Sequence, residues 1–463
     1  MRILPIVLLL AGLTAATALA KDDEPTPEQK FEKKWLKHRG NIAKEHFRLA
    51  NWLRGKKAPK TAYLHDLLAI HFDPDHRMAR GKLGYRKLDG QWVEKKLVRY
   101  DELVDEWRPD VEYREKDDAI RKERVESLHG LAGEAEKLGL AEKARELIHK
   151  AVDVDPTSEP AWVAAGYKKM GTSWFTDEEL AVFPQSIDIG RVEGQSEIAK
   201  TLRLTTEIWR SGRFHAEGSG APTEFEHYLR STRNTDAFIT FLTKRPTGPP
   251  ETPHYFYTLD DSDTFGEYLD AQPNLSPTDR AFYRDIGAHA GFQSAVVGSP
   301  LSSSHADFIA HHLGQRGLGM VGGRTPAWLL AGFTDYVSDR LNGTMICRFV
   351  KQESSGGSSG GVNQMTGMMW RRRLQAAVLT GSDAPFEDVF RADIPGLLGI
   401  PSMKAWSVFH FLARRNQAGF ADFIRITQGA EDGSHTAAAL KEVFGLPLGQ
   451  LELQWREWAV EHF

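Results

Sequence analysis

The chain has 463 residues, which is long enough for two or three domains. Hydrophobic residues make up 41% and charged residues 26% of the chain, as in ordinary soluble globular proteins, and the net charge is -4. This weakly acidic balance gives no broad basic surface, so nucleic acid and anionic membranes are not expected partners. Cys347 is the only cysteine, which excludes an intramolecular disulfide, and its apolar neighbours predict a buried strand thiol.

Residues 1–20 have the pattern of a secretory signal peptide. Arg2 supplies the positive start, Ile3 to Leu13 form the apolar stretch, and Ala18-Leu19-Ala20 is an A-x-A cleavage site before Lys21. An uncleaved anchor is the alternative, but the apolar stretch is short for a membrane-spanning helix. We therefore expect an exported protein, periplasmic or extracellular, with no membrane attachment after cleavage.

Residues 21–185 are predicted to form a helical domain with an internal repeat. Four features recur at an offset of 82 (155 − 73): Asp73-Pro74, Gly84-Tyr85, Lys87 and Trp92 reappear as Asp155-Pro156, Gly166-Tyr167, Lys169 and Trp174. Each unit predicts two helices, a break where proline stops the second helix, a short third helix and a Trp-bearing turn. The units resemble tetratricopeptide-like helical hairpins, which stack to bury a shared face. A plain helical bundle with a chance repeat is the alternative.

Residues 186–463 are predicted to form a second domain that begins with a lobe containing β-strands. Arg213 to Gly218 predicts a strand and turn, and His254 to Leu259 predicts a buried strand. Between them, Thr223 to Leu242 predicts a helix whose apolar side is formed by Phe225, Tyr228, Leu229, Phe238 and Phe241. Thr264 to Leu269 predicts a short helix. Further on, the low-complexity segment from Ser354 to Gly361 predicts a loop, either a lid over a groove or a tolerated insertion.

Two short motifs in this second domain have the spacing of a zinc-peptidase active site. The first is His311-His312-Leu313-Gly314-Gln315, and the second is Pro326-Ala327-Trp328-Leu329-Leu330-Ala331-Gly332. In H-E-x-x-H, two His one helical turn apart share a zinc ion and the Glu serves as general base. The first helix is expected to start with a capping box of Ser304 and Asp307 and to end at Gly317. The second is expected to start with Thr325 as its cap and Pro326 in its first turn.

From about residue 200 onward, the chain resembles a gluzincin-type, peptidase-MA-like zinc metallopeptidase domain of the secreted planctomycete type. The resemblance is carried by three features: the helix from Phe308 to Gln315, the P-x-W-L-x-x-G-x-x-x-Y motif from Pro326, and the closing run from Trp406 through Phe444-Gly445 to Trp455 and Trp458. It implies a mainly helical α+β fold, in which tetratricopeptide-like hairpins precede a gluzincin-like domain with a small sheet lobe and C-terminal helices.

The departures from the family pattern fall on the catalytic positions. His311 keeps the first ligand position, but Gln315 occupies the second ligand position and Ala331 the third. His312 stands where the family has its general base. Gln is a weak zinc ligand and Ala has no ligand atom, so we expect no bound metal, no cofactor and no catalytic residue. Asp335, one turn beyond Ala331, is the best substitute carboxylate if zinc binds through an unusual ligand set.

These features favour a secreted pseudopeptidase, that is, an inactive metallopeptidase homologue that binds a peptide or protein partner. Strand addition to a sheet edge would hold the peptide. Two alternatives stay open: an active zinc metallopeptidase with an unusual ligand set, and a structural or assembly protein of the cell envelope. His254, His289 and His410 lie in apolar stretches and are predicted to be core or groove histidines rather than ligands.

Overall fold

The structure is a computed structural model that describes residues 24–107, 110–290, 294–299, 305–319, 325–346, 364–393, 395–397, 399–430 and 432–463. Helices make up 64% of it and the sheets are small, which confirms the prediction of a mainly helical α+β protein. Contacts divide the chain into two units. The helical unit consists of the chain up to Gly166 together with Gln375–Ser382 and Ala459–Phe463, and the mixed unit consists of Tyr167–Leu374 and Asp383–Trp458. In the described segments, no helix combines the length and the apolar character needed to cross a membrane.

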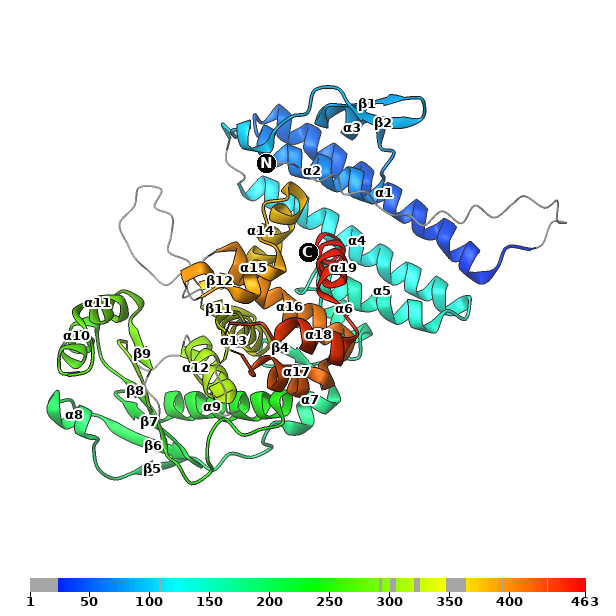
Figure 1. Cartoon of the computed structure of the whole chain (residues 1–463). Helices are drawn as coiled ribbons and strands as arrows, with labels where there is room; N and C mark the ends of the chain where they lie inside the picture. Colours follow the sequence, from blue (N-terminus) through cyan, green and yellow to red (C-terminus); the bar gives the residue numbers. More distant parts are fainter. Residues whose placement is uncertain are drawn as a thin grey trace. The chain divides into compact units, whose positions relative to one another are not determined.

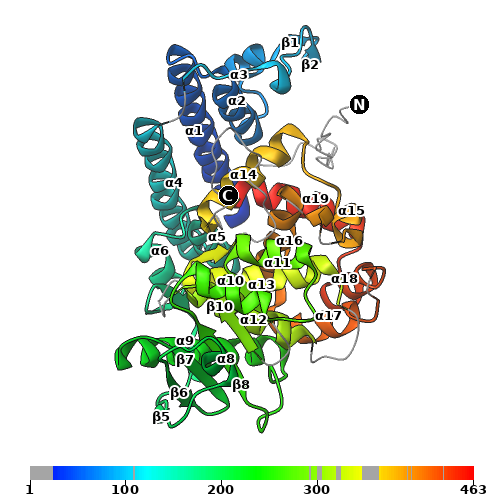
Figure 2. The same cartoon turned by 90° about the vertical axis from the view of Figure 1, so that its left-hand side faces the viewer.

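The helical unit is built from two long antiparallel helix pairs. Its elements are α1 (Pro27–Gly55), α2 (Pro59–Phe72), α3 (Arg77–Leu83), β1 (Tyr85–Leu88), β2 (Gln91–Glu94), η1 (Tyr100–Glu102), α4 (Val111–Lys137), α5 (Ala141–Val154) and α6 (Glu159–Ala164). Helix α1 packs against both α2 and α4, and α4 packs against α5, as Figure 2 shows. The core between α4 and α5 is aliphatic and contains Leu128, Leu147 and Ala151, all almost fully buried.

The element bounds recur at the offset seen in the sequence. Helices α2 and α5 begin and end 82 residues apart (141 − 59 and 154 − 72). The expected Trp-bearing turn is a two-stranded hairpin in both copies, β1–β2 in the first and β3 (Lys168–Met170) with β4 (Ser173–Phe175) in the second. Lys87 lies directly opposite Trp92, and Lys169 directly opposite Trp174. Each ammonium lies 5.4 Å from the centre of its indole ring, so the recurring Lys and Trp are cross-strand cation–π partners.

The second hairpin belongs to the mixed unit, so the division at Gly166 falls before the expected boundary at residue 185. The Ser173 hydroxyl donates to the carbonyl of Leu341 at 2.8 Å. Glu179 of α7 (Asp177–Val182) accepts hydrogen bonds from Arg340 at 2.8 and 2.9 Å. These long-range contacts attach the segment after Gly166 to residues 340–341, although its sequence repeats that of the helical unit.

The end of the chain completes the helical unit. Glu461, in the last turn of α19 (Leu448–His462), accepts ion-pair hydrogen bonds from Arg39 of α1 and Lys150 of α5. Its backbone carbonyl accepts from Arg124 of α4, and His71 Nε2 of α2 lies 3.5 Å from the carboxylate. Burial raises the pKa of Glu461, but His71, Lys150 and Arg39 lower it much more, so it lies well below its ordinary range.

Several histidines are buried among the helices of this unit. His38 Nδ1 lies 2.6 Å from Ser127 Oγ, and His46 Nδ1 lies 3.1 Å from His65 Nδ1. Burial, followed by the charges of Arg124, Lys150 and Arg39, lowers the pKa of His38 to about 4. Burial also lowers the pKa of His46 well below its usual value. Both imidazoles are therefore neutral in the folded chain at neutral pH.

This burial predicts that acid destabilises the helical unit before its carboxylates titrate. Unfolded histidine has a pKa near 6.5, so below that pH the unfolded chain binds a proton at His38. In the folded chain, His38 does not bind this proton until the pH reaches about 4. Stability is thus fully present above the unfolded pKa and is lost as pH falls towards the folded one. We expect the shifted pKa of His38 alone to lower the free energy of unfolding by about 2 kcal/mol between pH ~7 and ~5. Denaturant unfolding followed by circular dichroism at both pH values measures this loss, which His38→Gln should reduce and His435→Gln, at an exposed position, should leave unchanged.

The mixed unit contains the sheet and the remaining helices. Before α12 its further elements are β5 (Gly190–Val192), α8 (Glu197–Thr201), β6 (Glu207–Ser211), β7 (Phe214–Gly218), α9 (Pro222–Thr243), β8 (His254–Thr258), α10 (Ser262–Asp270), α11 (Pro277–Ile286), β9 (Ala288–Ala290) and β10 (Ser294–Val297). From there on they are α12 (Ala306–Gly319), α13 (Ala327–Asn342), β11 (Thr344–Ile346), β12 (Gln364–Thr366), α14 (Gly367–Thr380), α15 (Phe386–Arg391), η3 (Pro395–Leu397), α16 (Ile400–Asn416), η4 (Gln417–Gly419), α17 (Phe420–Thr427), α18 (Thr436–Phe444) and α19. The last turns of α14 and α19 belong to the helical unit.

In the part of the chain that the structure describes, the main sheet has six strands in the order β5-β6-β7-β8-β10-β9. Strands β7, β8 and β10 are parallel, and β9 runs antiparallel at one edge. Helix α9 packs on β6 and β7, and α12 packs against α9 and α13 (Figure 1). The predicted helix from Thr223 to Leu242 and the predicted strand from His254 are confirmed to within one residue at each end.

Two predicted helix ends on the motif helices are wrong. Helix α12 continues past Gly317 to Gly319. A Cβ on Gly317 would lie 2.5 Å from Ile239 Cγ2, so this glycine permits close packing of α12 on α9 rather than ending the helix. Thr325 does not cap α13, whose N-cap is Pro326. The Thr325 hydroxyl instead accepts a hydrogen bond from Gln428 at 2.7 Å.

The C-terminal helices bury a charged network beneath aromatic rings. The Lys404 ammonium of α16, which is fully buried, donates to Asp383 at 3.0 Å and to Glu452 at 2.8 Å. It also lies 4.0 Å from the ring centre of Phe386 and 4.4 Å from that of Trp455. Within this unit the network ties together α15, α16 and α19, and α15 and α16 also pack against the motif helix α13.

Candidate functional site

The predicted site positions lie on α12 and α13, which pack tightly against each other. The contact depends on Gly314, because a Cβ there would lie 2.9 Å from Thr334 Cγ2 of α13. His311 and His312 are almost fully buried, as is Ala331 on α13. The glycine in the H-H-L-G-Q motif therefore has a packing role, and the two motifs occupy neighbouring helices as their spacing predicted.

His311 and Gln315 are brought together, as expected for residues one helical turn apart. Gln315 Nε2 lies 2.8 Å from His311 Nε2. An amide nitrogen can only donate, so it donates its hydrogen to the ring nitrogen of His311. The lone pair of that nitrogen, which a zinc ion would need, is thus used within the helix.

His312 turns to the sheet. Its Nε2 lies 2.9 Å from Nε2 of His254, the first residue of β8, and the two rings stack with centroids 4.9 Å apart. Burial, then the charges of His312, Arg316 and Arg213, lower the pKa of His254 to about 2, so His254 is neutral. At the position of a general base, His312 is therefore joined to another imidazole and buried against Phe308 and Phe256.

Carboxylates near the motif helices also have structural partners. Asp307 of α12 accepts hydrogen bonds from Ser338 at 2.8 Å, Asn342 at 2.9 Å and Thr344 at 2.7 Å. It therefore anchors the end of α13 and the start of β11 to α12, a wider role than the predicted cap. Its expected cap partner, Ser304, lies outside the described residues. Asp335, the expected substitute ligand, is buried on α13.

The donor set does not fit a zinc ion. The third ligand position is the methyl group of Ala331, and Gln315 presents an amide nitrogen to His311. Across the described segments, no group of three or more His, Cys, Asp or Glu side chains is arranged to hold a metal ion. What these residues can do as they stand is to hydrogen-bond one another and hold α12 against β8.

The other singled-out histidines also have partners. His289 Nδ1 lies 2.8 Å from the Tyr268 hydroxyl, and His410 Nε2 lies 2.9 Å from Asp339 Oδ2. His254 is buried, as expected for a core histidine, and it also contacts the motif helix α12 through His312. Cys347, the loop from Ser354 to Gly361 and the predicted signal peptide lie outside the described residues.

Two arginines lie near the His254–His312 pair and were not predicted as site residues from the sequence. Arg316 directly follows Gln315 on α12, and Arg213 directly precedes β7. Both charges act on His254. The position of Arg316 next to the motif was a usable signal, but nothing local to Arg213 indicated that it would lie beside α12.

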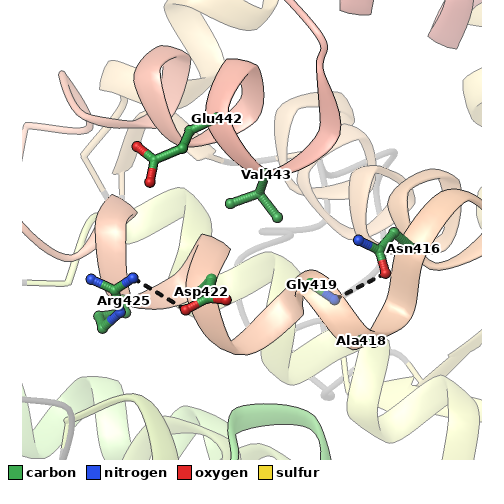
Figure 3. Close-up of a pocket in the computed structure, with 7 residues that line it drawn as sticks. All are labelled: Asn416, Ala418, Gly419, Asp422, Arg425, Glu442 and Val443. Atoms are coloured by element: carbon green, nitrogen blue, oxygen red, sulfur yellow. Dashed lines mark hydrogen bonds and ion pairs between the residues drawn. The ribbon is translucent and has the colours of Figure 1, made fainter.

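A separate open cavity of about 410 Å³ lies between η4, α17 and α18 (Figure 3). Its charged lining is formed by Asp422 and Arg425, which pair with each other at 3.1 Å, and by Glu442. Asn416 caps the turn by accepting a hydrogen bond from the Gly419 amide at 3.2 Å. None of the motif positions lines this cavity.

Comparison with known proteins assigns no relative to this chain: no family model matches the sequence, no curated protein matches it, and no solved structure matches the fold.

Proposed function

We propose that this chain is an exported pseudopeptidase, an inactive gluzincin-like protein that binds a peptide or protein segment. The observation that supports it best is the pairing of the motif side chains. His311 accepts a hydrogen bond from Gln315, and His312 is joined to His254. A peptidase would need these nitrogens for a metal and a water molecule, and Ala331 offers no ligand atom.

An edge of the main sheet supports a binding role. Among the described residues, strand β9 is last in the strand order and pairs with β10. An edge strand presents unpaired backbone groups on its outer side, to which an extended peptide can add as a further strand. The helical unit, with its tetratricopeptide-like helix pairs, would contact a protein partner. The exported location is part of the same proposal and rests on the N-terminal signal pattern.

Metal content tests the inactive site. The purified protein is expected to carry no stoichiometric zinc, because one imidazole cannot replace three ligands. Elemental analysis measures it directly. About one zinc per chain, lost on His311→Ala, would contradict the proposal and favour an active metallopeptidase with an unusual ligand set.

Restoring the family ligands tests the gluzincin-like arrangement. The triple change His312→Glu, Gln315→His and Ala331→Glu is expected to create zinc binding at about micromolar metal. The side chain at 315 already reaches the ring nitrogen of His311, so an imidazole there can share an ion with it. Calorimetric titration with zinc measures binding, and adding His311→Ala to the triple variant should abolish it. A folded triple variant that binds no zinc would mean that Ala331 does not face the 311–315 pair.

A further inference from the structure

A buried arginine beside the His254–His312 pair lacks one hydrogen-bond acceptor. Arg213 Nη2 donates to Asp236 at 3.0 Å and to the Thr247 hydroxyl. Its other terminal nitrogen, Nη1, has no acceptor among the described residues, although the side chain is only 8% exposed. An unsatisfied buried donor costs about 1–3 kcal/mol, and more when it is charged. An acceptor from outside the chain would remove that cost.

The guanidinium group of Arg316 lies close to that of Arg213. Both groups lie beside Gly248, because a Cβ built on this residue would lie 2.6 Å from Arg213 Nη1 and 3.2 Å from Arg316 Nη2. The two arginines come from different segments, Arg213 from the residue before β7 and Arg316 from the last turn of α12. Burial and the charge of Arg213 both lower the pKa of Arg316. Two cations are thus held together at a partly buried site.

The surrounding charges favour an added anion. Asp236 is hydrogen-bonded to Arg213, and Arg316 brings a second guanidinium group to the same point. His254 is neutral and adds no charge of its own. The guanidinium of Arg233 adds positive potential, since it lies against Gly212, the residue before Arg213. Arginine presents its donors in a planar fork that matches the two oxygens of a carboxylate.

We propose that Arg213 and Arg316 bind the C-terminal carboxylate of a peptide ligand. This assignment rests on the proposed peptide-binding function and adds which end of the peptide is recognised.

The sheet register supports this placement. Phe214 pairs with His254, Tyr255 with Ser294, and Ala295 with Ala290, so Arg213 lies at the same end of the sheet as the end of β9. Strands β10 and β8 separate β9 from β7, and a peptide paired with the outer side of β9 lies one strand further out, about 19 Å from Arg213. About six extended residues bridge that distance, so a peptide whose first residues pair with β9 can continue to the arginines.

The test compares two pools of random decapeptides that are labelled at the N-terminus and differ only in having a free or an amidated C-terminus. Fluorescence polarisation with the full chain is expected to show binding of the free-carboxylate pool about tenfold or more tighter than that of the amidated pool. Arg316→Gln, a change at a half-buried position, should remove this preference. Gly248→Ala should weaken it too, because the added methyl displaces the Arg213 guanidinium. Arg230→Gln, an exposed position on α9, is the matched control and should behave as the parent chain.

The outcomes separate this assignment from the proposed function. Equal binding of the two pools would overturn carboxylate recognition and leave peptide binding standing. Binding of neither pool would overturn peptide binding itself, and the carboxylate assignment with it. Inorganic phosphate at matched ionic strength is expected to compete only weakly. Tight competition by phosphate, without any difference between the pools, would assign the arginines to a free phosphate and contradict the peptide assignment.

Discussion

Replacing Glu461 with alanine is expected to lower the free energy of unfolding of the helical unit by about 3–5 kcal/mol. The carboxylate is 12% exposed and holds ion pairs with Arg39 and Lys150. Without it, two buried cations beside Arg124 lose their counter-ion, and breaking a buried pair costs more than the pair contributes. Denaturant titration of the full chain, followed by helical circular dichroism, measures the loss.

A matched control lies one turn earlier on the same helix. Glu457 is exposed, and Glu457→Ala is expected to change stability by less than about 0.5 kcal/mol. The pH profile gives a second readout. Because the folded pKa of Glu461 is depressed, its contribution is present above about pH 4.5 and is lost as the pH falls below that value. The variant should lack that part of the acid response, and equal acid responses in the parent and the variant would contradict the assigned role.

Lys404→Met is expected to destabilise the mixed unit by a similar amount, about 3–5 kcal/mol. The ammonium and the Asp383 carboxylate are both fully buried, and Arg456 at 3.0 Å is the other cation on that carboxylate. Lys404→Met leaves Asp383 with one of its two cationic partners and removes the positive charge beside the rings of Phe386 and Trp455, while the methionine side chain fills most of the space. Thermal and denaturant unfolding of the full chain measure the change.

Two further variants separate charge from packing. Lys441→Met, at an exposed position on α18, should have little effect. Adding Asp383→Leu to Lys404→Met removes the stranded carboxylate and should recover about half or more of the loss, since apolar groups can replace buried ion pairs. If the double variant is as unstable as Lys404→Met, the effect arises from packing around the rings and the electrostatic explanation is wrong.

Local features of the fold could be predicted because they depend on local signals. The apolar spacing from Thr223 to Leu242 and the proline beside its start define α9 to within one residue. The Asp-Pro pairs after α2 and α5 predicted where both helices end. The recurrence of Lys and Trp was visible, but not its cause, because the cross-strand pairing that joins them needs the hairpin.

Features that depend on distant contacts could not be predicted. Glycine ends helices and also permits close packing, and only the position of Ile239 shows that Gly317 does the latter. At the site, the helical period predicted that His311 and Gln315 meet. The pairing of His312 with His254 joins residues 58 apart and depends on how α12 packs on the sheet. Glu461 and Arg39 are 422 residues apart, so no local pattern links them.

The contribution of Ala459–Phe463 to the helical unit has a consequence for the order of folding. During synthesis, α1 to α5 leave the ribosome long before the carboxylate that neutralises Arg39 and Lys150 exists. Those helices can pair early, but their charged centre acquires its counter-ion only when the last turn of α19 arrives. The helices of the helical unit are therefore expected to reach their full stability only after α19 has been made.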